Sequence, residues 1–203
     1  EKFGIPRQSG MIEELEAKIV FEPEYRNPDA VRGLDEFSHI WLLWGFSLNR
    51  KSDGWSPTVR PPRLGGNKRM GAFATRSPYR PNPIGLSSVK IISIDLNTPK
   101  GPIIEIAGAD LLDGTPIYDI KPYLTFSDCR PDAKSGFAET TQDYFLEVQI
   151  DEGLLKNARA QSCPWEALKE ILSQDPRPAY QTDSERVYHL DYAEWQVDFQ
   201  VEN

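Results

Sequence analysis

Short runs of apolar and β-branched residues, separated by turn signals, recur along the first three quarters of the chain. The most apolar run, 38–46, is almost entirely aromatic or branched, as expected for a strand covered on both faces. Weaker strand patterns follow it at 69–75, 88–96, 103–109, 117–121 and 145–150. Because these strands are short and no helical pattern separates them, they favour an antiparallel β-barrel over a doubly wound parallel sheet.

The pattern changes after residue 152. The segment 164–172 has an apolar helical face, and Pro176 and Pro178 follow it and end the helix. The apolar face consists of Trp165, Leu168, Ile171 and Leu172. Residues 195–201 then alternate as a strand does. We therefore predict two domains, a mainly β domain over 1–152 with a barrel core and a small α+β domain over 153–203.

No apolar run approaches the roughly 20 residues that a membrane span needs. The chain opens at Glu1 without a signal-type apolar stretch. Its two cysteines, Cys129 and Cys163, are too few for a disulfide framework or a zinc site of their own. We expect a soluble, cytoplasmic protein with free thiols.

Metal chemistry is not predicted. The chain has only two histidines, and His39 lies inside the most apolar strand, which favours a hydrogen-bonded core histidine over a catalytic one. A metal site would then need carboxylates, and the one nearby trio is Asp110, Asp113 and Asp119. Nothing in their spacing holds them in ligand geometry.

Charge is distributed unevenly along the chain. The net charge is -8, yet residues 50–90 contain nine Lys and Arg against one acidic residue, Asp53, so this segment carries +8 and the remainder -16. A basic patch on an acidic body suits a polyanionic ligand. The alternative is a solvated basic loop without a ligand.

Within this segment, 49–68 is rich in Pro, Gly and charge, which predicts a long ordered loop. The blocks 60–67 and 71–86 add four arginines and two asparagines in backbone stiffened by Pro and Gly. Stiff backbone limits the entropy lost on binding, and arginine grips carboxylates and phosphates with two parallel hydrogen bonds. The alternative is a structural loop whose arginines cap carbonyl groups.

One block in this stretch resembles the signature of the TsaA-like, or TrmO-like, family of bacterial and archaeal tRNA methyltransferases: Gly71-Ala72-Phe73-Ala74-Thr75-Arg76-Ser77-Pro78-Tyr79-Arg80-Pro81-Asn82. Further similar blocks run along almost the whole chain, at 6–8, 29–34, 37–39, 60–67, 110–116, 119–123 and 175–180. So many ordered blocks make coincidence an inadequate explanation.

The resemblance implies a single-sheeted β-barrel that acts as a homodimer, with an N-terminal strand absent from this chain. It implies S-adenosylmethionine as cofactor and N6 of threonylcarbamoyl-adenosine, just 3′ of the tRNA anticodon, as the methylated atom. The cofactor contacts it implies are Pro6, Arg7, Gln8, Ser47, Leu48, Arg76, Leu86, Asp110, Leu111, Leu112 and Asp113. The pair Ser47-Leu48 departs from the His-Gln of close relatives.

For this reaction the main requirement is alignment of N6, the methyl carbon and sulfur, which contributes about 7–11 kcal/mol. The N6 proton is acidic because N6 belongs to a urea-like group, so a nearby acceptor helps to remove it. We predict Asp113 or Asp119 for this role. The alternative is that Asp113 makes the Asp-Gly turn and that Asp119 caps a strand end.

The predicted RNA contacts combine charge with aromatic stacking. The basic residues are expected to meet phosphates or the threonyl carboxylate, and aromatic rings to stack on the splayed-out base. The family resemblance implies that the C-terminal unit, with Arg177 and Tyr180, holds the anticodon stem. The predicted substrate contacts are Arg60, Arg63, Lys68, Arg69, Tyr79, Arg80, Asn82, Tyr123 and Arg177, with Trp55 as a further stacking candidate.

Two other functions remain open at this point. A non-catalytic RNA-binding module would use the same basic loop without any dependence on S-adenosylmethionine. A small-molecule methyltransferase would keep the cofactor site, but a small neutral substrate does not need the +8 segment.

Overall fold

A computed structural model describes residues 5–48, 55–61, 64, 67–140, 144–177, 181, 183–192 and 194–202. By their contacts the residues form two compact units. The first, here called the sheet unit, consists of Pro6–Gly45 and Ile84–Ala133. The second unit consists of Glu1–Ile5, Phe46–Pro83 and Lys134–Asn203. The domain boundary at residue 152 stays a prediction.

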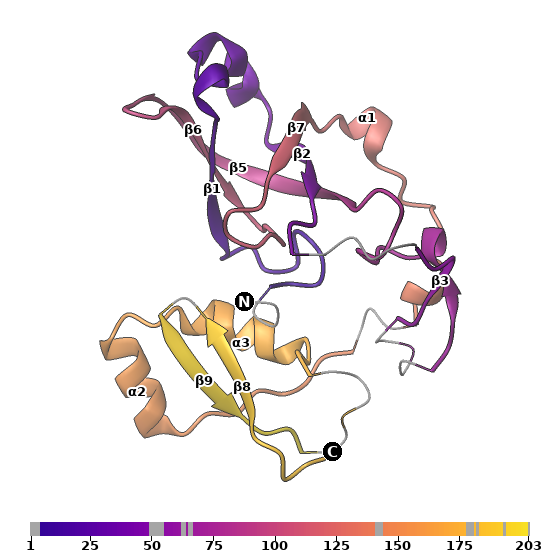
Figure 1. Ribbon diagram of the computed structural model, residues 1–203. Helices are drawn as coiled ribbons and strands as arrows, with labels where there is room; N and C mark the ends of the chain where they lie inside the picture. The colour runs from indigo at the N-terminus through magenta and orange to yellow at the C-terminus, as the bar shows by residue number, and fades with distance from the viewer. Residues whose placement is uncertain are drawn as a thin grey trace. The chain divides into compact units, whose positions relative to one another are not determined.

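The sheet unit is built on one antiparallel sheet of five strands with the order β1-β6-β5-β2-β7 (Figure 1). The strands are β1 (Glu16–Val20), β2 (His39–Gly45), β5 (Ile84–Thr98), β6 (Gly101–Ala107) and β7 (Ile117–Pro122). The predicted mainly β, antiparallel architecture is confirmed.

The closed barrel that we expected is not found among the described residues. The long strand β5 pairs with β2 over Ile84–Lys90 and with β6 over Lys90–Thr98, so the two halves of the sheet are offset along it. The edge strands β1 and β7 attach to opposite halves and pair only with β6 and β2. Because β1 and β7 do not pair with each other in the described residues, the sheet keeps two open edges.

Alternation along the strands separates an inner from an outer face. Ile40, Leu42, Val89, Ile104 and Ile106 point inward and are almost fully buried. Burial of each such side chain contributes about 1.5–3 kcal/mol, so this layer is the main source of stability in the unit. His39 is exposed, which corrects the expected core histidine, because it occupies an outward position of β2.

The second unit contains a two-stranded ribbon and an α+β part. In the ribbon, β3 (Thr58–Val59) pairs with β4 (Met70–Gly71). The predicted strand 69–75 is therefore too long, because the chain turns into a 3-10 helix at Ala72–Ala74. The predicted loop 49–68 is also wrong in part, since it contains β3.

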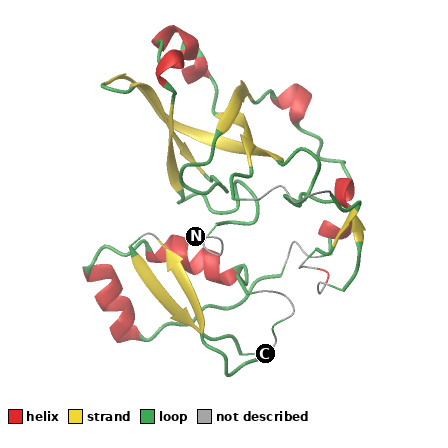
Figure 2. Ribbon diagram, viewed as in Figure 1, coloured by secondary structure: helices red, strands yellow, loops and turns green. Residues whose placement is uncertain are grey.

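The α+β part contains two helices and a hairpin (Figure 2). They are α2 (Glu152–Ala160), α3 (Trp165–Ser173), β8 (Tyr188–Tyr192) and β9 (Trp195–Phe199). The predicted helix and its apolar face are confirmed in α3, whose four apolar face residues are buried. No strand forms at 145–150, where Leu146 donates one backbone hydrogen bond to Ser173.

The remaining short elements are single turns. They are α1 (Thr125–Asp128) and the 3-10 helices Pro23–Tyr25, Pro28–Val31, Leu34–Glu36 and Gly136–Ala138. None of the helices in the described ranges is long and apolar enough to cross a membrane.

Candidate functional site

A buried chain of hydrogen bonds leads from the sheet core to Asp110, the first residue of a predicted cofactor-binding turn. Trp44 Nε1 donates to Ser87 Oγ at 2.9 Å, and Ser87 Oγ lies 2.5 Å from Asp110 Oδ1. Ser87 is 1% exposed and Trp44 is 8% exposed. The carboxylate of Asp110 is thus held from the inner face of the sheet.

The segment that follows the N-terminal block 6–8 is bonded to the segment that precedes the turn 110–113, through the backbone of Gly10 and Gly108. Gly10 N donates to Gly108 O at 2.8 Å, and Gly108 N donates to Leu15 O at 2.9 Å. Pro6 is buried, and the next two residues, Arg7 and Gln8, are half-buried. Two of the blocks predicted to bind the cofactor therefore lie in the same part of the sheet unit.

The turn after Asp110 is closed by Thr115, whose backbone N and Oγ1 lie 3.1 Å and 2.6 Å from Leu112 O. Gly114 has φ +72°, a left-handed conformation that favours glycine. Leu111 and Leu112 are half-buried, whereas Asp113 is exposed. Asp113 is therefore accessible to a substrate.

The outer face of the sheet carries two more of the predicted residues of this unit, Leu86 and Asp119. Leu43 lies opposite Leu86 on β5 and opposite Asp119 on β7, so the three form one row across the strands. At about 4.8 Å between strands, Leu86 and Asp119 are roughly 10 Å apart. They share this face, whereas Ser87 bonds Asp110 from the inner face.

Asp119 is held in an ion pair on this face. Its Oδ2 lies 2.9 Å from Lys121 Nζ, and its Oδ1 accepts a hydrogen bond from Ile120 N at 2.9 Å. The hydrogen bond from Lys121 keeps the pKa of Asp119 below its ordinary value. A carboxylate with a lowered pKa is a weaker base.

Tyr123 belongs to an aromatic cluster next to this row. Its ring centroid lies 5.5 Å from that of Trp41 and 6.3 Å from that of His39. Trp41 Nε1 in turn donates to Asp128 Oδ2 at 2.8 Å. The backbone N–H of Leu124 and then Trp41 lower the pKa of Asp128. Burial is the main cause that raises the pKa of Tyr123.

In the second unit, the signature loop 71–82 is held by its own polar groups. Arg80 Nη1 donates to Thr75 O at 3.0 Å and to Ser77 O at 3.3 Å. Arg80 thus caps carbonyl groups, as the alternative of a structural loop predicted. Tyr79 N donates to Ser77 Oγ at 3.2 Å, and the Tyr79 ring is exposed. Asn82 is exposed.

The ribbon β3–β4 carries an exposed aromatic pair. The ring centroids of Trp55 and Phe73 are 5.6 Å apart, and Phe73 is 71% exposed. The predicted basic contacts Arg60, Lys68, Arg69 and Arg76 are exposed in the same unit. Ser47 and Leu48 are exposed there too. Several residues of the blocks 60–67 and 175–180 lie outside the described residues, among them Arg63, Gly65, Gly66 and Tyr180.

Arg177 is directed into the protein rather than toward solvent. Its side chain is 8% exposed, and its Nε and Nη2 lie 2.8 Å and 3.0 Å from the two carboxylate oxygens of Asp175. Asp175 has φ +51°, and Tyr144 donates a long hydrogen bond to it at 3.3 Å. This geometry stabilises the turn after α3.

Sequence reasoning missed Ser87, Trp44 and Lys121. A polar residue at an inward position of an alternating strand was the signal for Ser87, and two charged residues two apart on β7 were the signal for the Asp119–Lys121 pair. No group of three or more metal-binding side chains occurs among the residues that the structure describes.

The sequence of this chain matches the models of two domains of one protein family. The model of the tRNA-methyltransferase O N-terminal domain matches residues 1–129, and that of the TrmO C-terminal domain matches 143–203. The tRNA (adenine(37)-N6)-methyltransferase of Escherichia coli K12 is 42% identical over 205 residues, covering 99% of this chain and 86% of that protein.

Two further similarities agree. The protein of the same name from Eikenella corrodens is 46% identical over 169 residues, covering 82% of this chain and 92% of its own. A crystal structure of TrmO from Pseudomonas aeruginosa superposes with a TM-score of 0.74 at 29% identity, covering 100% of this chain and 87% of that chain. The chain therefore belongs to the tRNA-methyltransferase O family.

Proposed function

We propose that this protein is an S-adenosylmethionine-dependent methyltransferase that methylates N6 of threonylcarbamoyl-adenosine 3′ of the anticodon in tRNA. The observation that carries the proposal is the 42% identity to the Escherichia coli tRNA (adenine(37)-N6)-methyltransferase over 99% of this chain. The structure adds support, because the predicted cofactor blocks 6–8 and 110–113 belong to one unit, and Gly10 and Gly108, two residues from each block, are bonded to each other.

The proposed cofactor site contains groups that suit this cofactor. S-adenosylmethionine supplies an electrophilic methyl group on a positively charged sulfur when it is bound. Asp110 offers a carboxylate in a fixed orientation, which suits a cationic ligand, and Leu86 offers exposed apolar surface. The remaining proposed contacts are Pro6, Arg7, Gln8, Ser47, Leu48, Arg76, Leu111, Leu112 and Asp113.

Of the two candidate acceptors for the N6 proton, the geometry favours Asp113. Asp119 is paired with Lys121 and has a lowered pKa, whereas Asp113 is exposed in the turn that follows Asp110. In the proposed step the methyl group forms a bond to N6, the bond from methyl to sulfur breaks, and Asp113 takes the proton from N6.

The proposed RNA surface lies largely in the second unit. Arg60, Lys68 and Arg69 are exposed there and would meet phosphates, with Arg63 as a further proposed contact. Tyr79 and the Trp55–Phe73 pair present aromatic surface for base stacking. Arg80, Asn82, Tyr123 and Arg177 complete the proposed set, although Arg80 and Arg177 already hold protein groups.

We also propose that the enzyme is located in the cytoplasm and acts as a homodimer. Residues 1–152 are proposed to carry catalysis, and residues 153–203 to form a separate domain. Cytoplasmic tRNA is the substrate of a tRNA-modifying enzyme, which supports the location. Sedimentation at several concentrations with and without tRNA measures the oligomeric state directly. A monomer at all concentrations contradicts the dimer.

The decisive experiment is transfer of a labelled methyl group. Labelled S-adenosylmethionine is mixed with the protein and with tRNA that contains threonylcarbamoyl-adenosine; tRNA from cells that lack this modification is the matched control. Label is expected only in the first tRNA. Salt-sensitive tRNA binding without any transfer or cofactor dependence would identify a binding module. Cofactor binding without transfer to either tRNA would identify a small-molecule methyltransferase.

A further inference from the structure

Ser87 is the one buried polar residue in the described part of the sheet unit. It sits opposite Leu42 on the inner face, among apolar side chains such as Ile40 and Val89. A hydroxyl in such a place is unfavourable unless it is hydrogen-bonded, and an apolar residue would pack there without that penalty. Packing alone therefore does not account for a serine at this position.

The direction of the hydrogen bonds at Ser87 is fixed by chemistry. The indole N–H of Trp44 only donates, so Ser87 Oγ accepts it. The single hydrogen of the Ser87 hydroxyl then goes to Asp110 Oδ1, and the distance of 2.5 Å is typical of a hydroxyl bonded to a carboxylate. The indole thereby sets the orientation of Ser87, and Ser87 sets that of Asp110.

Gly85 makes this arrangement possible. Trp44 lies opposite Gly85 in the register of β2 and β5, and a Cβ at Gly85 would lie 2.2 Å from Trp44 Cε2. The indole ring therefore lies directly over the backbone of β5, where only glycine leaves room for it. From this position its N–H reaches Ser87, two residues along the same strand.

We propose that Ser87, oriented by Trp44, is a positioning residue that holds the Asp110 carboxylate in the geometry needed to bind the cofactor. The inference rests on the proposed function, which assigns Asp110 to S-adenosylmethionine. Ser87 acts through Asp110 from the protein interior. The Gly85-Leu86-Ser87 segment then has two tasks, since Leu86 is a proposed cofactor contact on the opposite face of the same strand.

The test measures S-adenosylmethionine binding by calorimetry, and initial rates with modified tRNA, for Ser87→Ala. The dissociation constant and the KM for the cofactor are expected to rise roughly tenfold, the order expected for one hydrogen bond to a charged group. At saturating cofactor kcat should stay within about twofold, because the reacting atoms are untouched. Ser93→Ala is the matched control, since Ser93 lies on the same strand and bonds exposed Glu105.

A double-mutant cycle separates positioning from a general loss of structure. In an Asp110→Ala background, Ser87→Ala should have no further effect on the dissociation constant. Trp44→Phe keeps a smaller aromatic ring but removes the N–H donor, and should give a smaller rise in the dissociation constant than Ser87→Ala. It also serves as the test if Ser87→Ala does not fold. Unchanged binding by Ser87→Ala, or additive effects with Asp110→Ala, would overturn the positioning role. Absence of cofactor binding by the wild-type chain would overturn the proposed function as well.

Discussion

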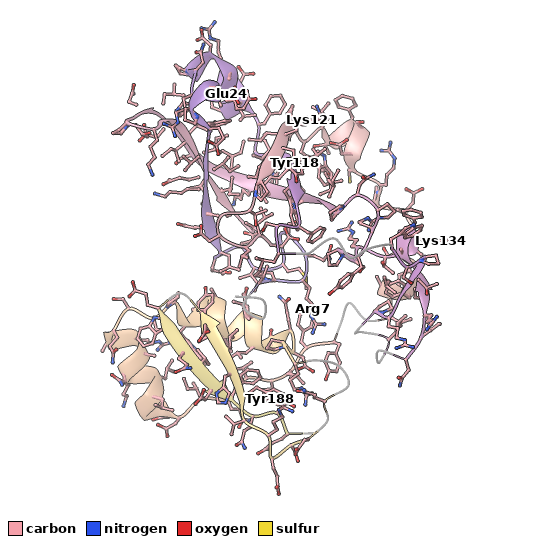
Figure 3. All side chains as sticks on the ribbon, in the orientation of Figure 1. Arg7, Glu24, Tyr118, Lys121, Lys134 and Tyr188 are labelled. Carbon is pink, nitrogen blue, oxygen red and sulfur yellow. The ribbon has the colours of Figure 1, made fainter. Side chains whose placement is uncertain are left out.

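Lys121 Nζ lies 2.9 Å from Asp119 Oδ2, on the outer face of β7. Figure 3 shows Lys121 on this strand. The pair holds the pKa of Asp119 below its ordinary value, first through the hydrogen bond from Lys121. Asp119 is therefore paired with a cation, whereas Asp113 is exposed in the turn after Asp110, although sequence reasoning treated the two aspartates alike.

The first prediction compares the two carboxylates as proton acceptors. Asp113→Asn is expected to lower kcat for methyl transfer by about 100-fold, the lower end of the range for a general base. Asp119→Asn should lower it by less than about threefold, because a carboxylate paired with Lys121 contributes little as a base. Single-turnover rates with bound cofactor measure the step itself. Equal losses in both variants would contradict the assignment.

A second prediction concerns the buried ion pair between Asp175 and Arg177. Removal of one partner leaves the other charge buried and unpaired, which costs about 3–5 kcal/mol in free energy of unfolding. We expect a loss of this size for Asp175→Ala, measured by urea denaturation. Exposed Asp183→Ala in the same unit is the control and should change stability by less than about 0.5 kcal/mol.

The same pair predicts how stability depends on pH. Burial alone would raise the pKa of Asp175, but the hydrogen bond and charge of Arg177 outweigh it and the net shift is downward. A lowered folded-state pKa means that the contribution is present above the unfolded pKa of about 3.9, and is lost as the pH falls through the folded pKa. The stability difference between the wild-type chain and Asp175→Asn should therefore be constant near neutral pH and shrink below about pH 4. A difference that grows on acidification would contradict the pairing.

The fold could be predicted from the sequence where the hydrophobic pattern of an element is local, and less well where the bounds of a strand depend on its pairing partner. The run 38–46 indicated β2 directly, and the apolar face of 164–172 indicated α3. β5 was expected to begin at Ser88, because three prolines precede Gly85, yet it begins at Ile84. Pairing of Ile84 with Gly45 extends the strand, and no local pattern reveals that partner.

In the candidate site, too, single residues could be identified from the sequence, but the contacts between them could not. Asp110 and Leu86 were identified through a resemblance between sequences, which carries no geometry. The bonds from Trp44 through Ser87 to Asp110 join residues 43 and 23 positions apart, so they exist only after β2, β5 and the end of β6 have come together. Arg177 illustrates the converse: the family resemblance suggested an RNA contact, and only the fold shows Asp175 bonded to it.

RNA binding gives a fourth prediction. Lys68→Ala and Arg69→Ala should each weaken tRNA binding at low salt and lower the slope of log affinity against log salt by about one, because each removes one phosphate contact. Exposed Lys100→Ala, at the turn between β5 and β6, is the matched control for loss of one positive charge. Filter binding over a salt series provides the measurement. Slopes that fall equally in all three variants would show a net-charge effect rather than local contacts.

The last prediction contrasts two glycines that face aromatic rings. A Cβ at Gly45 would lie 2.1 Å from Tyr118 Oη, and a Cβ at Gly85 would lie 2.2 Å from Trp44 Cε2. The distances are nearly equal, but Tyr118 is 63% exposed and its ring can move into solvent, whereas Trp44 is buried and bonded to Ser87. Gly85→Ala should therefore lower the free energy of unfolding by about 1–3 kcal/mol, as overpacking does, and Gly45→Ala by less than about 1 kcal/mol. Because Gly85→Ala also displaces the indole, it should weaken S-adenosylmethionine binding as Ser87→Ala does, and Gly45→Ala should not. Urea denaturation and calorimetry on the two variants give both quantities, and equal destabilisation by the two alanines would show that the indole is free to move.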